Sequence, residues 1–280
     1  MDILKIGNRD FATKGKTYIM GILNVTPDSF SDGGKFNTLD KALNHAQQMI
    51  DEGADILDIG GESTRPGHSL ISDEEEISRV VPIIERLKQE FDIPISLDTY
   101  KSKVAEAGIE AGADLINDVW GLKYDADLGK VIAKYDLPCC LMHNRHNKIY
   151  TYFLEDVNNE LQETINLAHL AGIKDEKIIL DPGIGFGKTP ELNLTMLNHL
   201  DSLKTLGYPL LLGTSRKSTI GLVLDTPVNE RVEGTLVTSV LAVIHDYMFV
   251  RVHDVKANYR AVKMMEAIKY ETIKPNGGNI

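Results

Sequence analysis

Ten polar side chains lie at or near the ends of short apolar runs, where a buried strand would give way to a loop. Such positions favour apolar residues in a core built only for stability, because a buried polar group without a partner costs about 1–3 kcal/mol. Taken singly, each residue could equally well cap a helix or hold a loop through hydrogen bonds, without any catalytic or binding role. Taken together, they favour a functional site. The set is Asn24, Asp58, Asp98, Asn117, His143, Asp181, Ser215, Lys217, Arg251 and His253.

Three members of this set are rich in hydrogen-bond acceptors. If buried, Asp98, Asn117 and Asp181 would be satisfied best by the adjacent N–H donors of a flat heterocycle. Lys217 supplies the complementary donor for a ring oxygen or nitrogen. The group therefore predicts recognition of a guanine-like edge, as on a pterin or a purine. The alternative remains that the aspartates only cap the backbone and that Lys217 is solvated.

Two basic residues end the last apolar run. Arg251 and His253 precede a helix expected to start near Asp254. A helix N-terminus with arginine and histidine beside it attracts phosphate. The sequence thus predicts a site for a flat, amide-bearing ring together with an anion. His253 alone is also consistent with a strand-end histidine whose hydrogen bonds are satisfied within the protein.

Eight short apolar runs, each followed by a segment of helical pattern, would position these side chains. This alternation predicts an α/β protein with a (β/α)8 TIM barrel. The C-terminal ends of its strands meet at one mouth, where the active sites of this fold lie. The runs cover Tyr18–Leu23, Asp55–Gly60, Ile93–Asp98, Asp114–Trp120, Pro138–His143, Lys177–Pro182, Pro209–Thr214 and Met248–His253.

We expect a single domain over residues 1–280, with the core barrel over about 18–270. Residues Ile3–Lys16 contain turn formers and precede the first barrel strand, so they are predicted to form an N-terminal hairpin that closes the barrel bottom.

Three local signals concern the helices. Ser72 and Glu75 form a capping box, and Thr189 followed by Pro190 marks a helix start. Pro82 should bend its helix or displace the start of that helix.

Composition restricts the partners and the compartment. Thirty basic and 41 acidic side chains give a net charge of −11, which disfavours binding to nucleic acid or to an anionic membrane surface. Only Cys139 and Cys140 occur, inside an apolar run, so they are predicted to be core residues in a reducing compartment. No signal-peptide pattern or membrane-spanning run is present. We expect a soluble, cytoplasmic protein that acts on small molecules.

Glycine-rich segments follow two of the predicted strands. Arg65 in GGESTRPG is suited to bind a carboxylate or phosphate, although an exposed loop arginine is more often only solvated. The segment DPGIGFGKTP fits neither the dinucleotide-binding fingerprint nor the P-loop spacing. No CxxC, HExxH or nucleophile-elbow pattern is present, which argues against a structural zinc site, a zinc protease and an α/β-hydrolase.

Seven segments occur in the order NVTPDSFSDGG, GGESTRPG, SLDT, INDV, LDPGIGFGK, GTSRKS and RVHDV. With them, the chain closely resembles the bacterial dihydropteroate synthases, from about Ile19 to His253. The resemblance implies a (β/α)8 barrel, a homodimer and a Mg²⁺-dependent transferase of folate biosynthesis that is the target of sulfonamides. Its reaction joins 6-hydroxymethyl-7,8-dihydropterin diphosphate to p-aminobenzoate and releases pyrophosphate.

The resemblance also implies roles for individual residues. The pterin pocket comprises Asp98, Asn117, Asp181, Lys217, Phe186 and Met142. The pyrophosphate site comprises Asn24, Arg251 and His253, with Asn24 also the Mg²⁺ contact. The p-aminobenzoate site comprises Thr64, Arg65, Pro66, Ser218 and Phe30. The catalytic residues are Asp98, Lys217, Asp32, Arg251 and His253.

The implied mechanism is an SN1-like substitution, with the loop that carries Phe30, Ser31 and Asp32 closing over both substrates. A rival is a pterin-binding barrel of the methyltransferase type. It shares the acidic pterin pocket but does not need the TRPG loop, the SRKS stretch or the RVHD anion site. A barrel with a purely structural or interaction role is the other alternative.

Overall fold

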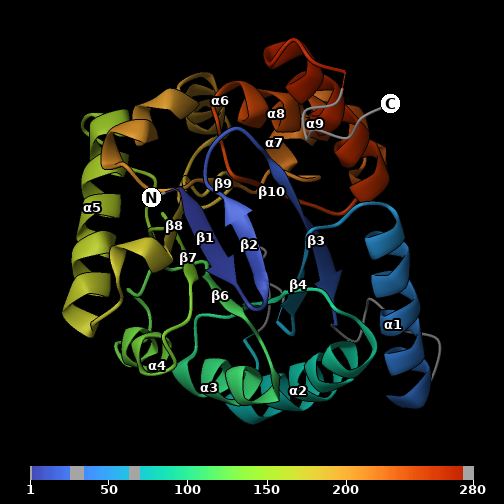
Figure 1. Cartoon of the computed structure of the whole chain (residues 1–280). Coiled ribbons are helices and arrows are strands. Elements are labelled where there is room, and N and C mark those ends of the chain that lie inside the picture. Colours follow the sequence, from blue (N-terminus) through green and yellow to red (C-terminus); the bar gives the residue numbers. More distant parts are fainter. Residues whose placement is uncertain (1, 26–34, 63–69, 274–280) are drawn as a thin grey trace.

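The computed structural model describes residues 2–25, 35–62 and 70–273. Its main sheet consists of parallel strands in the order β8-β7-β6-β5-β4-β3-β10-β9. A further parallel bridge pairs Leu180 with Leu210 and brings the first and last of these strands together. The predicted (β/α)8 barrel is therefore confirmed (Figure 1). The barrel strands are β3 (Tyr18–Asn24), β4 (Ile56–Gly60), β5 (Ile95–Asp98), β6 (Leu115–Asp118), β7 (Cys139–Met142), β8 (Ile178–Asp181), β9 (Leu211–Leu212) and β10 (Phe249–Val252).

Helices surround the barrel as an outer layer (Figure 1). Each barrel strand is followed by an α-helix, and β9 is followed by two, α7 and α8. The α-helices are α1 (Lys35–Asp51), α2 (Asp73–Glu90), α3 (Ser102–Ala111), α4 (Leu128–Lys134), α5 (Phe153–Ala171), α6 (Pro190–Asn198), α7 (Ser218–Leu224), α8 (Val232–Ile244) and α9 (Val255–Lys269). Short 3₁₀ helices are η2 (Asp175–Lys177), η3 (Leu200–Leu206) and η4 (Val228–Glu230).

Alternation along the strands divides the buried side chains into two sets. In β4, Leu57 and Ile59 belong to the large cluster formed with the helices, whereas Ile56 belongs to the cluster inside the barrel. Successive strand residues point to opposite faces, so Asp58 also points inward. The same two-residue period turns one polar side chain inward at the C-terminal end of most strands. This is the geometric reason that the predicted site residues come together.

The N-terminal hairpin closes the other end of the barrel. Strands β1 (Ile3–Ile6) and β2 (Arg9–Ala12) pair antiparallel, as predicted, and lie across the barrel in Figure 1. Phe11 is only 2% exposed and meets the rings of Tyr18 and Phe249 at centroid distances of 4.8 and 5.6 Å. These aromatic contacts fill the end of the barrel with apolar side chains, which leaves the opposite end for polar ones.

The helix signals have mixed outcomes. The hydroxyl of Ser72 accepts a hydrogen bond from the Glu75 amide at 3.2 Å, and that of Thr189 accepts from the Leu192 amide at 3.3 Å, so both predicted helix starts are confirmed. Helix α2 nevertheless begins directly after Ser72 with Pro82 inside it, so this proline does not displace the helix start.

Both cysteines are fully buried core residues, as predicted. No helix within residues 2–25, 35–62 and 70–273 is long and apolar enough to cross a membrane.

Replacing Phe11 by alanine tests whether the hairpin is an integral part of the barrel. Removing a buried phenylalanine leaves a cavity, so the free energy of unfolding should fall by about 3–5 kcal/mol in urea denaturation. Ile3→Ala in the same hairpin is the control, because Ile3 is 58% exposed and should change stability by less than about 1 kcal/mol. Equal effects of the two substitutions would mean that the hairpin does not pack as described.

Candidate active site

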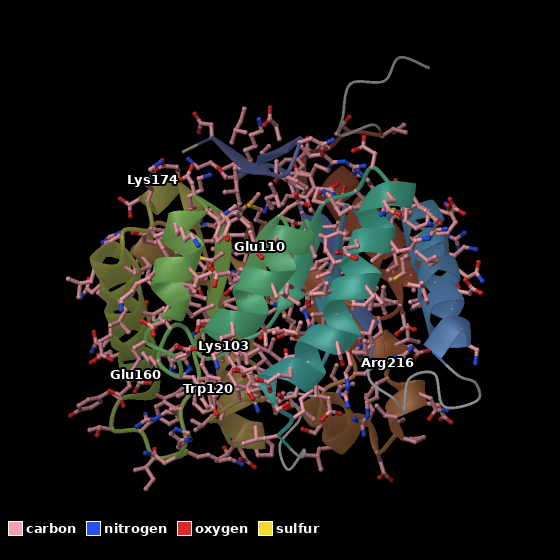
Figure 2. The ribbon with its side chains drawn as sticks, turned by 90° about the horizontal axis from the view of Figure 1, so that it is seen from below. Lys103, Glu110, Trp120, Glu160, Lys174 and Arg216 are labelled. Carbon is pink, nitrogen blue, oxygen red and sulfur yellow. The ribbon has the colours of Figure 1, made fainter. Side chains whose placement is uncertain are left out.

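The polar mouth lies at the end of the barrel opposite the hairpin. Figure 2 shows the hairpin at one end with Lys174 towards it, and Trp120, Glu160 and Arg216 towards the other end. The mouth carboxylates and amide are almost fully buried: Asp98 is 6%, Asn117 4% and Asp181 5% exposed. Groups buried to this degree must find partners in the protein or in a ligand.

Arg251 joins two carboxylates inside the barrel. Its Nε donates to Asp58 Oδ2 at 2.5 Å and one terminal nitrogen donates to Asp98 Oδ2 at 2.6 Å. The Asn117 amide also points to Asp58, at 3.4 Å. One guanidinium thus connects β10 with β4 and β5. The two neighbouring carboxylates raise the pKa of Arg251 against the opposing effect of its burial, so it is permanently charged.

Asp98 is the carboxylate of this bridge that still has an acceptor to offer. Its Oδ1 is buried and has no hydrogen-bond partner within the described part of the chain. Burial raises the pKa of Asp98 to about 7, against the attraction of Arg251. A buried carboxylate oxygen of this kind is satisfied by an N–H donor of a ligand.

Asp181 supplies the second acidic group of the mouth. Its Oδ1 accepts a hydrogen bond from the Gly183 amide at 2.6 Å. Burial raises the pKa of Asp181 to about 6, while this bond and the charges of Lys217, Lys188 and Arg251 oppose the rise. The side chain therefore faces a cluster of cations, and it carries its charge at neutral pH.

An apolar wall adjoins these groups. Met142 packs with Tyr100 and Val119, and Trp120 and Phe186 pack against that cluster. The ammonium group of Lys217 lies 4.0 Å from the centroid of the Phe186 ring. A flat heterocycle fits such a wall through its faces, while its N–H edge meets the carboxylates. The structure thus brings together Asp98, Asn117, Asp181, Lys217, Phe186 and Met142 around the mouth.

The anion-binding candidates are placed differently from one another. The hydroxyl of Ser215 lies 2.9 Å from His253 Nδ1 and 3.1 Å from the His253 amide, so this histidine is tied to the loop after β9. Arg251 is paired with carboxylates, a contact that sequence reasoning did not predict. Helix α9 begins at Val255, close to the predicted start, and Ser218 is the first residue of α7.

His143 does not contact the pocket carboxylates through its side chain. Its Nε2 lies 3.0 Å from Glu160 of α5, and its Nδ1 lies 2.8 Å from Lys188. The expectation that His143 lies in the polar mouth is therefore wrong. Met142 points into the pocket, so the next residue, His143, points to the opposite face and bonds to helix α5.

Several predicted site residues lie outside the described residues: Phe30, Asp32, Thr64, Arg65 and Pro66. The metal contact Asn24 is described; it ends β3, and its Oδ1 approaches the space beside Gly60 at the mouth. Among the described residues, no group of three or more His, Cys, Asp or Glu side chains could hold a metal. A single amide oxygen fits Mg²⁺ when substrate phosphates and water complete the coordination.

Two features of the site were missed at the level of sequence. The first is the ion pair between Asp58 and Arg251. Successive residues of a strand point to opposite faces, and this alternation turns both side chains into the barrel, which was the available signal. Lys188 lies in the segment DPGIGFGKTP, which matches no phosphate-binding pattern, yet it is only 3% exposed and its ammonium group bonds the loop after β8. A charged residue inside a glycine-rich loop after a buried strand was the available signal.

Comparisons with known proteins agree with this pocket. Residues 20–253 match the model of the family described as pterin binding enzyme. The dihydropteroate synthase of Clostridium beijerinckii is 63% identical over 95% of this chain and 99% of its own, and that of Bacillus subtilis is 54% identical over 91% and 90%.

Solved structures are also similar. The dihydropteroate synthase of Clostridium difficile with pteroic acid superposes with a TM-score of 0.89 at 54% identity, covering 91% of this chain and 98% of its own. That of Xanthomonas albilineans with 4-aminobenzoic acid gives a TM-score of 0.91 at 40% identity, covering 96% and 98%.

Replacing Arg251 by methionine tests the buried bridge. Asp58 and Asp98 would then be buried without their cation, which should lower the free energy of unfolding by about 3–5 kcal/mol near neutral pH. Burial raises the pKa of Asp98 above its unfolded value, and without the attraction of the guanidinium this pKa would rise further. The folded variant would then bind more protons than the unfolded chain, so its deficit should shrink as pH falls.

Urea unfolding near pH 8 and near pH 5.5 measures this deficit. Arg216→Met is the control, because the pair of Arg216 with Asp254 is partly exposed and should contribute about 1 kcal/mol or less. If Arg251→Met lowers the free energy of unfolding only as much as Arg216→Met does, or by the same amount at both pH values, Arg251 does not stabilise the two buried carboxylates as described.

Proposed function

The chain belongs to the family of pterin binding enzymes, and from this we propose that it is a dihydropteroate synthase. The reaction joins 6-hydroxymethyl-7,8-dihydropterin diphosphate to p-aminobenzoate, giving 7,8-dihydropteroate and pyrophosphate. The observation that carries the proposal is the buried Oδ1 of Asp98, which has no hydrogen-bond partner among the described residues, at a mouth that also holds Asp181 and an apolar wall. This is the arrangement that the N–H edge of a pterin requires.

The proposed pterin pocket uses complementary groups on two sides of the ring. Asp98 and Asp181 accept hydrogen bonds from the ring edge, and Asn117 contributes a further polar contact. Lys217 donates to a ring oxygen or nitrogen from its position over Phe186. Met142 and Phe186 pack against the ring face. Asp98 and Lys217 are also the proposed catalytic residues of this pocket, because charged groups that bind the ring edge can stabilise charge that develops on the ring.

The diphosphate would lie towards Asn24, Arg251 and His253. Arg251 stays bonded to Asp58 and Asp98. It therefore provides a fixed positive charge near the leaving group and does not move to bind the diphosphate. His253 is oriented by Ser215 at the start of α9. Mg²⁺, held by Asn24 and the diphosphate oxygens, would neutralise the charge of the leaving pyrophosphate when bound.

The p-aminobenzoate site is proposed at the other side of the mouth. Ser218, the first residue of α7, would meet the carboxylate of this substrate. Phe30, Thr64, Arg65 and Pro66 complete the proposed site, and Asp32 is the proposed catalytic residue of the first loop. In the proposed order of events the loop that carries Phe30 and Asp32 closes over the bound substrates and excludes water.

Charge favours an SN1-like course. Preorganised positive groups at the phosphate end stabilise the developing negative charge of pyrophosphate. The methylene group left on the pterin then has cationic character, which Asp98 and Asp181 stabilise through the ring edge. The aromatic amine is neutral at pH 7 and attacks directly, with its proton lost after the C–N bond forms. A strong general base is therefore not required.

The function is tested by pyrophosphate release with all three components present, the pterin diphosphate, Mg²⁺ and p-aminobenzoate, with dihydropteroate identified by its mass. Product that requires each component supports the proposal. Tight pterin binding without product would instead indicate a barrel of the methyltransferase type.

The pH dependence of pterin binding tests the acidic pocket separately. Protonated Asp98 accepts N–H donors poorly, and its pKa is about 7. The affinity for 6-hydroxymethylpterin should therefore rise with pH up to about 7, by at most about tenfold per pH unit, as followed by isothermal titration calorimetry. In Asp98→Asn the affinity should be lower and the rise between about pH 6 and 7 should disappear, whereas Asp181, with a pKa of about 6, still contributes a rise at lower pH. An unchanged pH profile in Asp98→Asn would exclude Asp98 from the pocket.

We also propose a cytoplasmic homodimer. Helices α7 and α8 expose large apolar side chains: Leu222 is 65%, Val223 61% and Val237 62% exposed. Large apolar side chains exposed on two helices that pack together are typical of a subunit interface. Val237→Glu should therefore convert a dimer, measured by light scattering, into a monomer. Met264→Glu is the control, because Met264 on α9 is also 62% exposed. A monomeric wild type would contradict the proposal.

A further inference from the structure

Lys188 is a buried lysine behind the pocket, between β8 and α6. It is 3% exposed, and its ammonium group makes three described contacts. They are to His143 Nδ1 at 2.8 Å, the Gly183 carbonyl oxygen at 3.0 Å and the Phe186 carbonyl oxygen at 3.2 Å. An ammonium group has three donors, so these contacts use all of them.

The contact with Glu160 fixes the tautomer of His143. Because the Glu160 carboxylate of α5 can only accept, His143 Nε2 carries the imidazole hydrogen and donates it at 3.0 Å. Nδ1 therefore has no hydrogen and accepts from Lys188. Burial lowers the pKa of His143 to about 4, which agrees with a neutral ring. Glu160 also meets Arg145 at 3.1 Å and lies towards the mouth end of the molecule in Figure 2.

The two carbonyl groups held by Lys188 belong to the loop that shapes the pocket. Gly183 donates its amide hydrogen to Asp181, and Phe186 carries the ring under Lys217. The loop has little freedom at this point. Gly183 has φ +69°, and a Cβ there would lie 1.9 Å from the His143 carbonyl oxygen. Any shift of the loop would therefore move both the Asp181 carboxylate and the Phe186 ring.

The lysine also contributes charge. Burial lowers the pKa of Lys188 to about 7, and the attraction of Asp181 opposes this decrease. In return, Lys188 is one of three cations that favour the charged form of Asp181. An uncharged residue of the same size would lose this attraction together with the three hydrogen bonds.

We propose that Lys188 is a positioning residue of the pterin pocket: it holds the carbonyl groups of Gly183 and Phe186, and so orients Asp181 and Phe186 towards the pterin, with His143 and Glu160 as its support. This inference rests on the proposed function. It assigns Lys188 no contact with substrate, so its loss should weaken pterin binding without a comparable effect on p-aminobenzoate.

The test compares Lys188→Met with Lys174→Met, which removes the same charge from a surface pair with Asp136. Calorimetry with 6-hydroxymethylpterin measures binding directly, and steady-state assays give KM for p-aminobenzoate. Lys188→Met should weaken pterin binding about tenfold or more, because hydrogen bonds from a charged donor are lost. KM for p-aminobenzoate should change less than about threefold, and Lys174→Met should resemble the wild type.

Substitutions at His143 decide the question even if Lys188→Met fails to fold. His143→Gln keeps a side-chain oxygen that can accept from Lys188, whereas His143→Leu leaves the lysine without this partner. The inference predicts pterin binding near the wild-type level for His143→Gln and clearly weaker binding for His143→Leu. Equal affinities of these two variants would overturn it. So would equal effects of Lys188→Met on both substrates, or no effect in the folded variant.

Pterin binding by the wild type and by the variants distinguishes a failure of this inference from a failure of the proposed function. If the wild-type protein does not bind 6-hydroxymethylpterin at all, the proposed function fails. If the wild type binds it and the Lys188 and His143 variants bind it equally well, only the positioning role fails.

Discussion

One guanidinium shared by two buried carboxylates is the interaction on which the site depends. Arg251 reaches from β10 into the barrel and bonds Asp58 of β4 and Asp98 of β5. A buried arrangement of two negative charges and one positive charge is incomplete, because it leaves one negative charge to be compensated. Burial raises the pKa of Asp98, and the nearby charge of Asp58 adds to this rise. Asp98 Oδ1 has no partner among the described residues and remains available as an acceptor. A ligand with N–H donors completes the arrangement.

The rest of the barrel makes such a costly arrangement possible. The hairpin and the rings of Phe11, Tyr18 and Phe249 fill one end with apolar contacts, which stabilise the fold. The opposite end can then hold buried charge close to an apolar wall of Met142 and Phe186. The shape of the pocket also depends on the loop after β8. Asp181 and Phe186 lie at this loop, so a small shift of the loop would move both side chains.

The fold was predictable because its signals are local and repeated. Each apolar run has strand length, each is followed by a helical pattern, and the last inward residue of a strand is fixed by the two-residue period. Three residues of the proposed pterin pocket, Asp98, Asn117 and Asp181, followed from their positions at or next to the ends of strands. Phe186 and Met142 were implied only by the family resemblance. The roles of Thr64 and Arg65 stay predictions, because these residues lie outside the described part of the chain.

What the sequence could not supply is the pairing of charges. Arg251 and Asp58 are 193 positions apart, and only closure of the barrel brings them together. For the same reason Arg251 was expected to meet only an anionic ligand, and the bond between Lys188 and His143 was not foreseen. Local patterns indicate which side chains turn inward, but the distances between strands decide which of them bond.

The most direct test of this account is a crystal structure of the protein with 6-hydroxymethylpterin. The account predicts that the ring lies against Phe186 and Met142, that its N–H edge donates to Asp98 Oδ1 and to Asp181, and that Arg251 keeps its bond to Asp58. A pterin bound elsewhere, or bound at the mouth with its N–H edge turned away from both aspartates, would contradict it.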